Sequence, residues 1–184
     1  MKLHLRLYAI AILLIIIGTW YYLQKPTNQT INKPLTITTM HLTSQAFENN
    51  QNLPPKYTCD GENISPPLQI SNVPTEAKSL VLIVDDPDAP IGDWVHWMVW
   101  NIPPTTTDIA EGSAPTGIQG VSDFGTADYG GPCPPNGTHR YFFKLYALNT
   151  TLNLPPTAKK TEIESAMEES IITRTELVGI YSRG

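Results

Sequence analysis

Two segments of the chain each combine a proline-containing turn with a following stretch that carries a histidine. The first turn is DDPDAP at residues 85–90, and it leads to WVHW at residues 94–97. The second is GGPCPP at residues 130–135, and it leads to HRY at residues 139–141. Because binding side chains often stand where a loop meets a rigid strand, we expect a pocket mouth beside each histidine.

The hydrogen-bond donors of these segments are suited to a small anion. The imidazoles of His96 and His139 titrate near pH ~6.5. The Tyr141 hydroxyl and the backbone N–H groups of residues 130–131 add further donors. Together these groups predict a site for a negatively charged ligand.

The acceptors beside them are the carboxylates of Asp86 and Asp88. They can orient the imidazoles or hold the ammonium group of a ligand. Because a nearby carboxylate raises the pKa of a histidine, we expect both histidines to be cationic closer to neutral pH. This mixture favours a small zwitterion or a phosphomonoester over a bare metal ion.

Each feature also has a purely structural interpretation. A histidine on an apolar strand can be an ordinary core residue, and residues 85–88 can form an Asx-type turn that ends a strand. Residues 132–135 can be a stiff connection. From these residues alone, a shared site and a set of separate structural features both remain open.

Turn residues and alternating apolar residues divide the chain into strands, and a continuous apolar run predicts that residues 79–85 are buried on both faces. The expected strands are 35–42, 68–73, 79–85, 93–102, 119–124, 139–148 and 176–181. A capping-box pattern with Thr161 as the N-cap and Glu164 at the third helical position predicts one helix, which ends near Ile172.

Strand alternation assigns the candidate side chains to faces. It places His139 and Tyr141 on one face of the last long strand. It places His96 on the same face as Trp94 and Met98. Each histidine is therefore expected near one end of an otherwise apolar face.

The succession of strands, with one short late helix, predicts an all-β-dominated fold, a two-sheet antiparallel β-sandwich. The chain has 17 prolines and 41% apolar residues, too apolar a composition for a disordered chain. Its 12 Lys and Arg against 17 Asp and Glu give a net charge of −5, which argues against nucleic acid as the main partner.

The first 25 residues predict a separate hydrophobic helix that acts as a targeting or anchoring segment. Residues 7–23 carry no charge, and Lys2 and Arg6 precede them, as in a secretory signal or an uncleaved signal anchor. The bulky residues 19–22 offer no small-residue cleavage site and suit a membrane interface, which favours the anchor. A cleaved signal and a buried core helix are the alternatives.

Both leading alternatives predict export, with the rest of the chain membrane-anchored or secreted into a space such as the periplasm. Residues 26–34 are polar, with proline at each end, and are expected to be a linker to a domain at residues 35–184. Without residues 1–25 the chain keeps 9 basic and 17 acidic residues, which disfavours docking on an anionic membrane surface.

Five motifs of the chain resemble, in order, the phosphatidylethanolamine-binding protein family, and within it the bacterial and archaeal Raf-kinase-inhibitor-like branch. They are YTCDGENISPPL (57–68), DDPDAP (85–90), DWVHW (93–97), GPCPPNGTHRYFFKLYAL (131–148) and ELVGIYSRG (176–184). The resemblance covers about residues 35–184. It implies a β-sandwich with one small pocket for phosphate-like anions or a phosphoethanolamine head group, without a cofactor.

The resemblance also assigns residues to that pocket, motif by motif. The implied ligand-binding residues are Asp86, His96, Gly131, Cys133, His139 and Tyr141. The implied wall residues are Asp88, Pro90 and Trp94. The resemblance further implies a cis peptide bond between Ala89 and Pro90.

The two cysteines, Cys59 and Cys133, both lie in motif loops. Cysteines of an exported domain usually pair. The same motif cysteines also occur in family members that look cytosolic, where no bridge is expected. A disulfide between Cys59 and Cys133 is therefore possible but not decided by the sequence.

Other functions compete with a binding module. A hydrolase would need Cys133 as nucleophile with His139 as base, and a metal site would use Asp86 and the two histidines. Protease inhibition is known in parts of the family, so a protein-binding or inhibitory role is the main alternative. We expect a module that is not an enzyme, holds no metal, and binds a phosphate-type anion or phospholipid head group.

Overall fold

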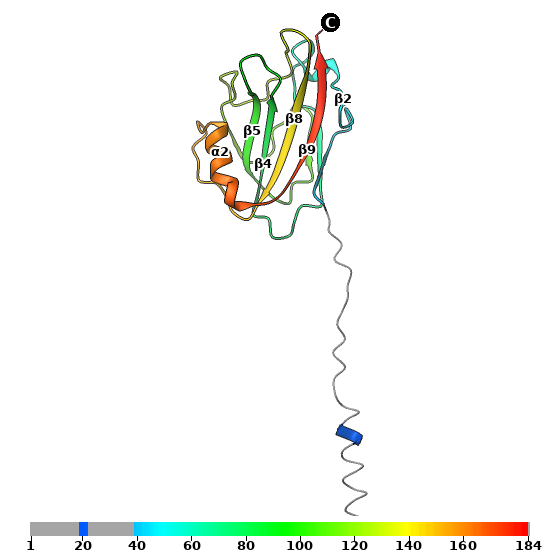
Figure 1. The fold of residues 1–184 in the computed structure, drawn as a ribbon, viewed down its shortest axis with the longest axis vertical. Helices are drawn as coiled ribbons and strands as arrows, with labels where there is room; N and C mark the ends of the chain where they lie inside the picture. The colour runs from blue at the N-terminus through cyan, green and yellow to red at the C-terminus, as the bar shows by residue number, and fades with distance from the viewer. Residues whose placement is uncertain (1–18, 22–38, 184) are drawn as a thin grey trace, which may run out of the picture. The chain divides into compact units, whose positions relative to one another are not determined.

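The computed structural model describes residues 19–21 and 39–183 (Figure 1). The chain divides into two compact units, Met1–Thr36 and Ile37–Gly184. In the first unit residues 19–21 are helical, and Trp20 and Tyr21 are exposed. The predicted hydrophobic helix at residues 1–25 and the linker at residues 26–34 otherwise lie outside the described residues. Within the described part, no helix has both the length and the apolar character needed to cross a bilayer.

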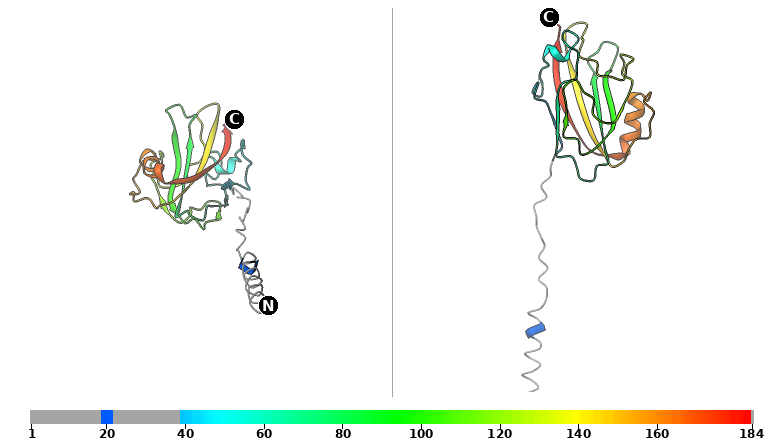
Figure 2. Two further views of the ribbon diagram at one scale, coloured as in Figure 1. Left: turned by 60° about the horizontal axis from the view of Figure 1, so that its bottom comes forward. Right: turned by 180° about the vertical axis from the view of Figure 1, so that it is seen from behind.

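Two β-sheets form the second unit. The smaller sheet has the order β1-β3-β6, with β1 at His41–Thr43, β3 at Leu68–Ser71 and β6 at Asp108–Ile109. The larger sheet has the order β2-β9-β8-β4-β5-β7. Its strands are β2 (Gln51–Asn52), β4 (Ser79–Asp86), β5 (Trp94–Ile102), β7 (Ile118–Gln119), β8 (Thr138–Leu148) and β9 (Ile171–Ser182). Its long strands β9, β8, β4 and β5 lie side by side in Figures 1 and 2.

These sheets confirm the prediction of a mostly β fold with two sheets and one short helix. One pair departs from the expected antiparallel arrangement, because β2 runs parallel to β9. Of the strand expected at residues 35–42, the structure describes residues 39–42. The strand found there is β1, at His41–Thr43. The strand expected at residues 119–124 is only the two-residue β7, and the segment that follows it is a loop.

Strand β4 is buried along its whole length, as its continuous apolar run predicts. Leu80, Leu82 and Val84 pack between the two sheets. Val81 and Ile83 pack on the opposite side, in a cluster that includes residues of helix α2 (Lys160–Met167). Because both faces are covered, this strand is a rigid support for the residues that follow it.

Helix α2 begins two residues earlier than the capping pattern predicts. The Lys159 backbone N–H donates to a carboxylate oxygen of Glu162 at 2.8 Å, so Glu162 caps the helix rather than Glu164. A short 3-10 turn, η2 (Glu168–Ser170), follows α2, and another, η1 (Pro55–Tyr57), lies between β2 and β3. Strand β9 then starts at Ile171, earlier than expected, because its residues pair with β8 along nearly the full length of that strand.

A β-bulge interrupts the pairing of β4 with β5. Val84 pairs with Trp97, whereas the next residue, Asp85, pairs with Val95, so His96 is an extra residue in β5. Strict alternation of side chains therefore fails here. Met98 packs in the cluster with α2, whereas His96 lines a cavity on the opposite side of the strand. The prediction that His96 shares a face with Met98 is wrong for this reason.

Candidate functional site

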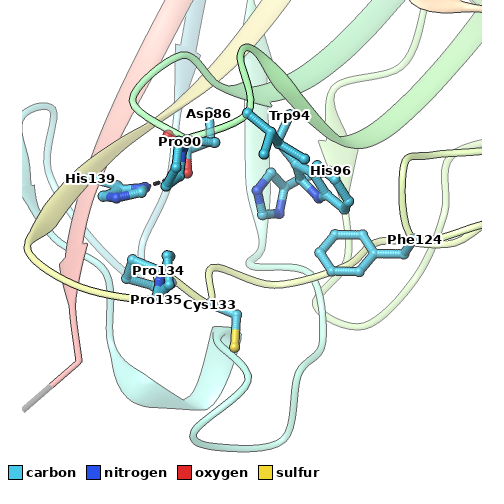
Figure 3. A pocket seen from close by; sticks show the side chains of 11 residues that line it. Asp86, Pro90, Trp94, His96, Phe124, Cys133, Pro134, Pro135 and His139 are labelled. Carbon is cyan, nitrogen blue, oxygen red and sulfur yellow. Dashed lines mark hydrogen bonds and ion pairs between the residues drawn. The ribbon is translucent and has the colours of Figure 1, made fainter.

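A cavity of about 410 Å³ opens where the end of β4 meets the beginnings of β5 and β8 (Figure 3). Its polar lining side chains are Asp86, His96 and His139. The rest of its lining consists of apolar side chains and one half-cystine: Ala89, Pro90, Ile91, Trp94, Phe124, Cys133, Pro134 and Pro135. The two histidine segments of the sequence thus line one shared cavity.

Asp86 and His139 form a buried pair at the polar end of this cavity. His139 Nδ1 lies 2.7 Å from Asp86 Oδ2, and the two residues are 6% and 3% exposed. The second carboxylate oxygen, Oδ1, accepts the Asp88 backbone N–H at 2.9 Å. Because a carboxylate only accepts, His139 Nδ1 carries the proton and donates, which leaves Nε2 for a ligand.

The bulge turns His96 toward the same cavity (Figure 3). Its Nδ1 lies 2.6 Å from the Gly130 carbonyl oxygen, and the Gly130 N–H donates back to the His96 carbonyl oxygen at 3.1 Å. A carbonyl oxygen accepts only, so Nδ1 of His96 also carries its proton. As in His139, Nε2 is the nitrogen left for a ligand.

Burial lowers the pKa of His96 below its ordinary value of 6.5, and the Gly130 carbonyl and the Asp86 carboxylate oppose this shift without cancelling it. The expectation that nearby carboxylates keep His96 cationic near neutral pH is therefore wrong. Desolvation of a buried imidazolium outweighs the attraction of carboxylates that are already hydrogen-bonded. His96 is neutral at pH 7.

Tyr141 packs behind both histidines rather than on the cavity wall. Its ring centroid is 5.2 Å from that of His96, with the rings nearly perpendicular, and 6.5 Å from that of His139, with the rings stacked. The side chain is 1% exposed, and among the described residues its hydroxyl has no hydrogen-bond partner. Burial, and then the nearby Asp86 carboxylate, raise the pKa of Tyr141, so the hydroxyl keeps its proton and is a donor.

Two of the residues assigned by resemblance are engaged elsewhere. The Gly131 N–H donates to Asn63 Oδ1 at 2.8 Å, and Gly131 is not among the lining residues. Asp88 accepts three hydrogen bonds from Arg140, one from its backbone N–H and two from its guanidinium group. Those bonds hold the pKa of Asp88 below its usual value. Both residues therefore shape the loops around the cavity without lining it.

Cys59 and Cys133 form a disulfide, with 5.4 Å between their Cα atoms. The Cys59 N–H also donates to the Pro132 carbonyl oxygen at 3.1 Å, so the loop that carries Cys133 is held at two adjacent points. Cys133 lines the cavity, and Figure 3 shows its sulfur pointing away from the two histidines. While this disulfide is intact, Cys133 has no free thiol and cannot act as the nucleophile that a hydrolase based on Cys133 and His139 would need.

The turn at residues 85–92 differs from the expectation in one peptide bond. The Ala89–Pro90 bond is trans, as are all the peptide bonds of the described residues. Two hydrogen bonds close the turn instead. The Asp88 N–H donates to Asp86 Oδ1, and the Gly92 N–H donates to the Ala89 carbonyl oxygen at 3.1 Å. These two hydrogen bonds reverse the chain without a cis bond.

Phe124 forms one wall of the cavity, although no motif of the sequence indicated it. Its ring meets those of Trp94 and His96 edge-on, with centroids 5.5 and 5.3 Å apart. Its loop is fixed to β5, because Val95 N–H donates to Asp123 Oδ2 and Asp123 N–H donates to the Val95 carbonyl oxygen. A single aromatic residue within the polar stretch SDFGTAD was the available signal.

The cavity does not have the arrangement of a metal centre. Within the described part of the chain, no three His, Cys, Asp or Glu side chains are grouped so that they could hold a metal ion. Asp86 and His139 are already bonded to each other, and Nδ1 of His96 is bonded to a carbonyl oxygen. The chemistry of the cavity is instead that of a hydrogen-bonding polar end within apolar walls.

Known proteins are similar to this chain in sequence, and two solved structures are similar to it in fold. Two UPF0098 proteins are similar to the chain, one from Methanothermobacter thermautotrophicus (52% identity over 79% of this chain and all of that protein) and one from Pyrococcus horikoshii (53% over 76% and 75%). A solved phosphatidylethanolamine-binding protein homolog from Chlamydia trachomatis is 45% identical, with a TM-score of 0.77 over 80% of this chain and 99% of that one.

The E. coli protein YbcL, described as a member of the mammalian phosphatidylethanolamine-binding protein family, is 33% identical. Its structure matches with a TM-score of 0.74 over 79% of this chain and 99% of its own. The family profile for phosphatidylethanolamine-binding proteins matches residues 43–182, which include every residue that lines the cavity. The chain therefore belongs to the phosphatidylethanolamine-binding protein family.

Proposed function

We propose that the chain is a non-catalytic module that binds phosphate-type anions at the polar end of the cavity. The observation that carries this proposal is the pair of buried imidazoles. His96 and His139 each commit Nδ1 to an acceptor, and each keeps Nε2 for the cavity. Membership of a family named for binding a phosphate-containing lipid supports the same class of ligand.

An anion and a proton would bind together at this site. Neutral His96 has an unprotonated Nε2, which has to gain a proton before it can donate to a phosphate oxygen. An entering negative charge favours that protonation, because opposite charges stabilise each other in a poorly solvated site. Phosphate affinity is therefore expected to weaken as the pH rises from 6 to 8.

Asp86 supports this site although it carries the same charge as the ligand. Its Oδ2 is bonded to His139 Nδ1 at 2.7 Å. Its second oxygen is taken by the Asp88 N–H. Asp86 is thus a positioning residue that holds the His139 ring with Nε2 available to the ligand.

Calorimetric titration of the purified full-length chain with inorganic phosphate, at pH 6 and pH 8, tests the proposal. We expect saturable binding at pH 6, weaker binding at pH 8, and a loss of at least about tenfold in affinity for His139→Ala. His41→Ala is the control, because His41 is an exposed histidine on β1, in the other sheet. No binding by the folded protein at either pH, or equal affinity in His139→Ala, would overturn the proposal.

An inhibitory or other protein-binding role is the second candidate function. Ile91 is 79% exposed and Phe124 is 44% exposed, and both line the cavity, so exposed apolar side chains stand at one site, as they do at many protein contacts. A panel of serine proteases assayed with the full-length chain tests this role. Inhibition that is lost in Ile91→Asp supports it, and no inhibition of any protease counts against a protease inhibitor.

For the N-terminal segment we propose export and membrane anchoring, on the charge-free run at residues 7–23. Fractionation of cells that express the full-length chain tests this placement. Recovery of the intact chain in the membrane fraction supports an anchor, and recovery of a shortened soluble chain outside the cytoplasm supports a cleaved signal. Intact chain in the cytoplasm would refute both.

A further inference from the structure

We infer that the cavity selects phosphomonoesters of uncharged, apolar alcohols over phosphoethanolamine and over inorganic phosphate. This inference rests on the proposed function, because it assumes that a phosphate group occupies the polar end. It concerns the rest of the ligand, and it follows from what lines the remainder of the cavity.

The cavity is much larger than its polar end. Its volume is about 410 Å³, and among the described residues its polar lining side chains are Asp86, His96 and His139, of which Asp86 and His139 are bonded to each other. A phosphate group is a single tetrahedral centre, which fills only the part of this volume beside the imidazoles. A ligand that uses the whole cavity therefore carries an organic group that extends from the phosphate toward the mouth.

The walls around that organic group are apolar. Trp94 and Phe124 meet edge-on at 5.5 Å and form one side, and Pro90 and Pro134 contribute to the remainder of the wall. Figure 3 shows Trp94 and Phe124 on the side of His96, and Pro90 and Pro134 near His139. Each methylene group that a ligand buries against such walls raises affinity by about fourfold.

The cavity offers an ammonium group no uncommitted acidic side chain among the described residues. Asp86 is the one acidic side chain among them that lines it, and an ammonium group would have to share its oxygens with His139 Nδ1 and the Asp88 N–H. The neighbouring carboxylate, Asp88, is held by the Arg140 guanidinium group. An ammonium group between these walls would lose hydration while it competes for a carboxylate that already binds two donors, which is unfavourable.

A matched pair of ligands tests this inference. n-Propyl phosphate and phosphoethanolamine have the same chain length and differ only in a terminal methyl group against an ammonium group. Titration of the full-length chain at pH 6 is expected to give at least about tenfold tighter binding for n-propyl phosphate than for phosphoethanolamine. n-Propyl phosphate should also bind more tightly than inorganic phosphate, because its three buried carbons contact the walls.

The possible failures are distinguishable. If phosphoethanolamine binds as tightly as n-propyl phosphate or more tightly, the inference is wrong and the proposed function stands; the aromatic walls then hold the cation instead. If inorganic phosphate equals n-propyl phosphate, the organic group stays outside the cavity and the inference also fails. If the folded protein binds none of the three, the proposed function itself is wrong.

Phe124→Ala tests whether the apolar wall of the cavity causes the preference for n-propyl phosphate. We expect the ratio of n-propyl phosphate affinity to inorganic phosphate affinity to fall toward one, and Phe124→Leu to restore most of it. The matched control is Phe142→Ala, which removes a phenyl ring that packs on β8 beside Arg140 and Lys144, outside the cavity lining. An unchanged ratio in Phe124→Ala would overturn the assignment of Phe124 to ligand selection, whatever the variant does to absolute affinity.

Discussion

His139 Nδ1 lies 2.7 Å from Asp86 Oδ2, and this bond joins residues 53 positions apart in the sequence. It connects the end of β4 to the beginning of β8, two neighbouring strands of the larger sheet. Both side chains are almost fully buried, so the bond fixes the orientation of the imidazole ring. The polar end of the cavity depends on this orientation.

Asp86→Asn is expected to weaken inorganic phosphate binding by about tenfold or more. The amide oxygen can still accept from His139, but the neutral amide lacks the carboxylate charge that raises the pKa of His96 against the effect of burial, so a proton and an anion bind less readily. Titration calorimetry at pH 6 measures the loss. Asp108→Asn, at an exposed aspartate on β6, should bind like the unmodified chain. Equal affinities for all three proteins would show that Asp86 does not support the site.

Tyr141→Phe separates ligand binding from stability. Because the buried hydroxyl has no partner among the described residues, its removal should leave the free energy of unfolding unchanged or raise it by up to about 1 kcal/mol. If the hydroxyl donates to a bound phosphate, affinity should fall about tenfold. Urea unfolding and calorimetry check both outcomes, with the buried Tyr146→Phe as control. Lower stability with full affinity would mean that Tyr141 is only structural.

The lowered pKa of His96 predicts how stability depends on pH. Between the folded-state pKa and the ordinary value of 6.5, the unfolded chain binds more protons than the folded chain. The free energy of unfolding therefore falls as the pH is lowered through and below about 6.5, and this loss is absent at higher pH. Urea unfolding of the ligand-free chain from pH 8 to pH 5 measures this dependence.

His96→Asn assigns this dependence to His96. The asparagine amide can still donate to the Gly130 carbonyl but does not titrate, so the decrease below pH 6.5 should become shallower. The exposed His41→Asn should keep the slope of the unmodified chain. Identical slopes in all three proteins would show that His96 has its ordinary pKa.

Reduction of the Cys59–Cys133 disulfide is expected to lower the free energy of unfolding by about 4 kcal/mol. The bond joins residues 74 positions apart, and a cross-link over so long a segment strongly restricts the unfolded chain. Hydrogen bonds from Cys59 to Pro132 and from Gly131 to Asn63 still join the same loops, so phosphate affinity should change less than about threefold. Unfolding with and without a dithiol measures the loss. Cys59→Ser/Cys133→Ser should not respond to the dithiol, and equal stability of the oxidised and reduced chains would refute the expectation.

Lys160→Met is expected to lower the free energy of unfolding by about 3 kcal/mol. The Lys160 ammonium group bonds to Asp85, a fully buried carboxylate whose Oδ1 has no partner among the described residues. Lys144 also bonds to Asp85, at 2.7 Å, so removing the Lys160 ammonium group leaves the buried charge with one partner instead of two. The control is Lys159→Met, which replaces the exposed neighbouring lysine. It should change the free energy of unfolding by less than about 0.5 kcal/mol. Urea unfolding compares the two, and equal effects would show that Lys144 alone compensates Asp85.

Local sequence patterns determined much of this fold. The continuous apolar run at residues 79–85 predicted a strand buried on both faces, and β4 occupies Ser79–Asp86. Such a feature follows from the chain itself, because alternation, turn residues and apolar runs act over a few neighbouring residues. The shared pocket was implied by the family resemblance of the motifs around Asp86, His96 and His139, and these three side chains line one cavity.

Features that depend on distant contacts could not be predicted. The bulge at His96 arises from a register shift between β4 and β5. It turns the His96 side chain toward the cavity and away from the face that carries Met98. Gly131 was assigned to the ligand, but its N–H is taken by Asn63, which lies 68 positions earlier. Phe124 reaches the wall because Asp123 fixes its loop to β5.

The charge of His96 was decided in the same way. From the sequence, the nearby carboxylates predicted a raised pKa, whereas the folded chain buries the imidazole and lowers it. The burial of this one polar side chain depends on elements that are distant in the sequence and pack around it in the fold. The sequence determined which chemical groups this protein has, and the tertiary structure decided which of them meet and how far each is removed from water, because desolvation and long-range pairing depend on all the elements packed around a residue.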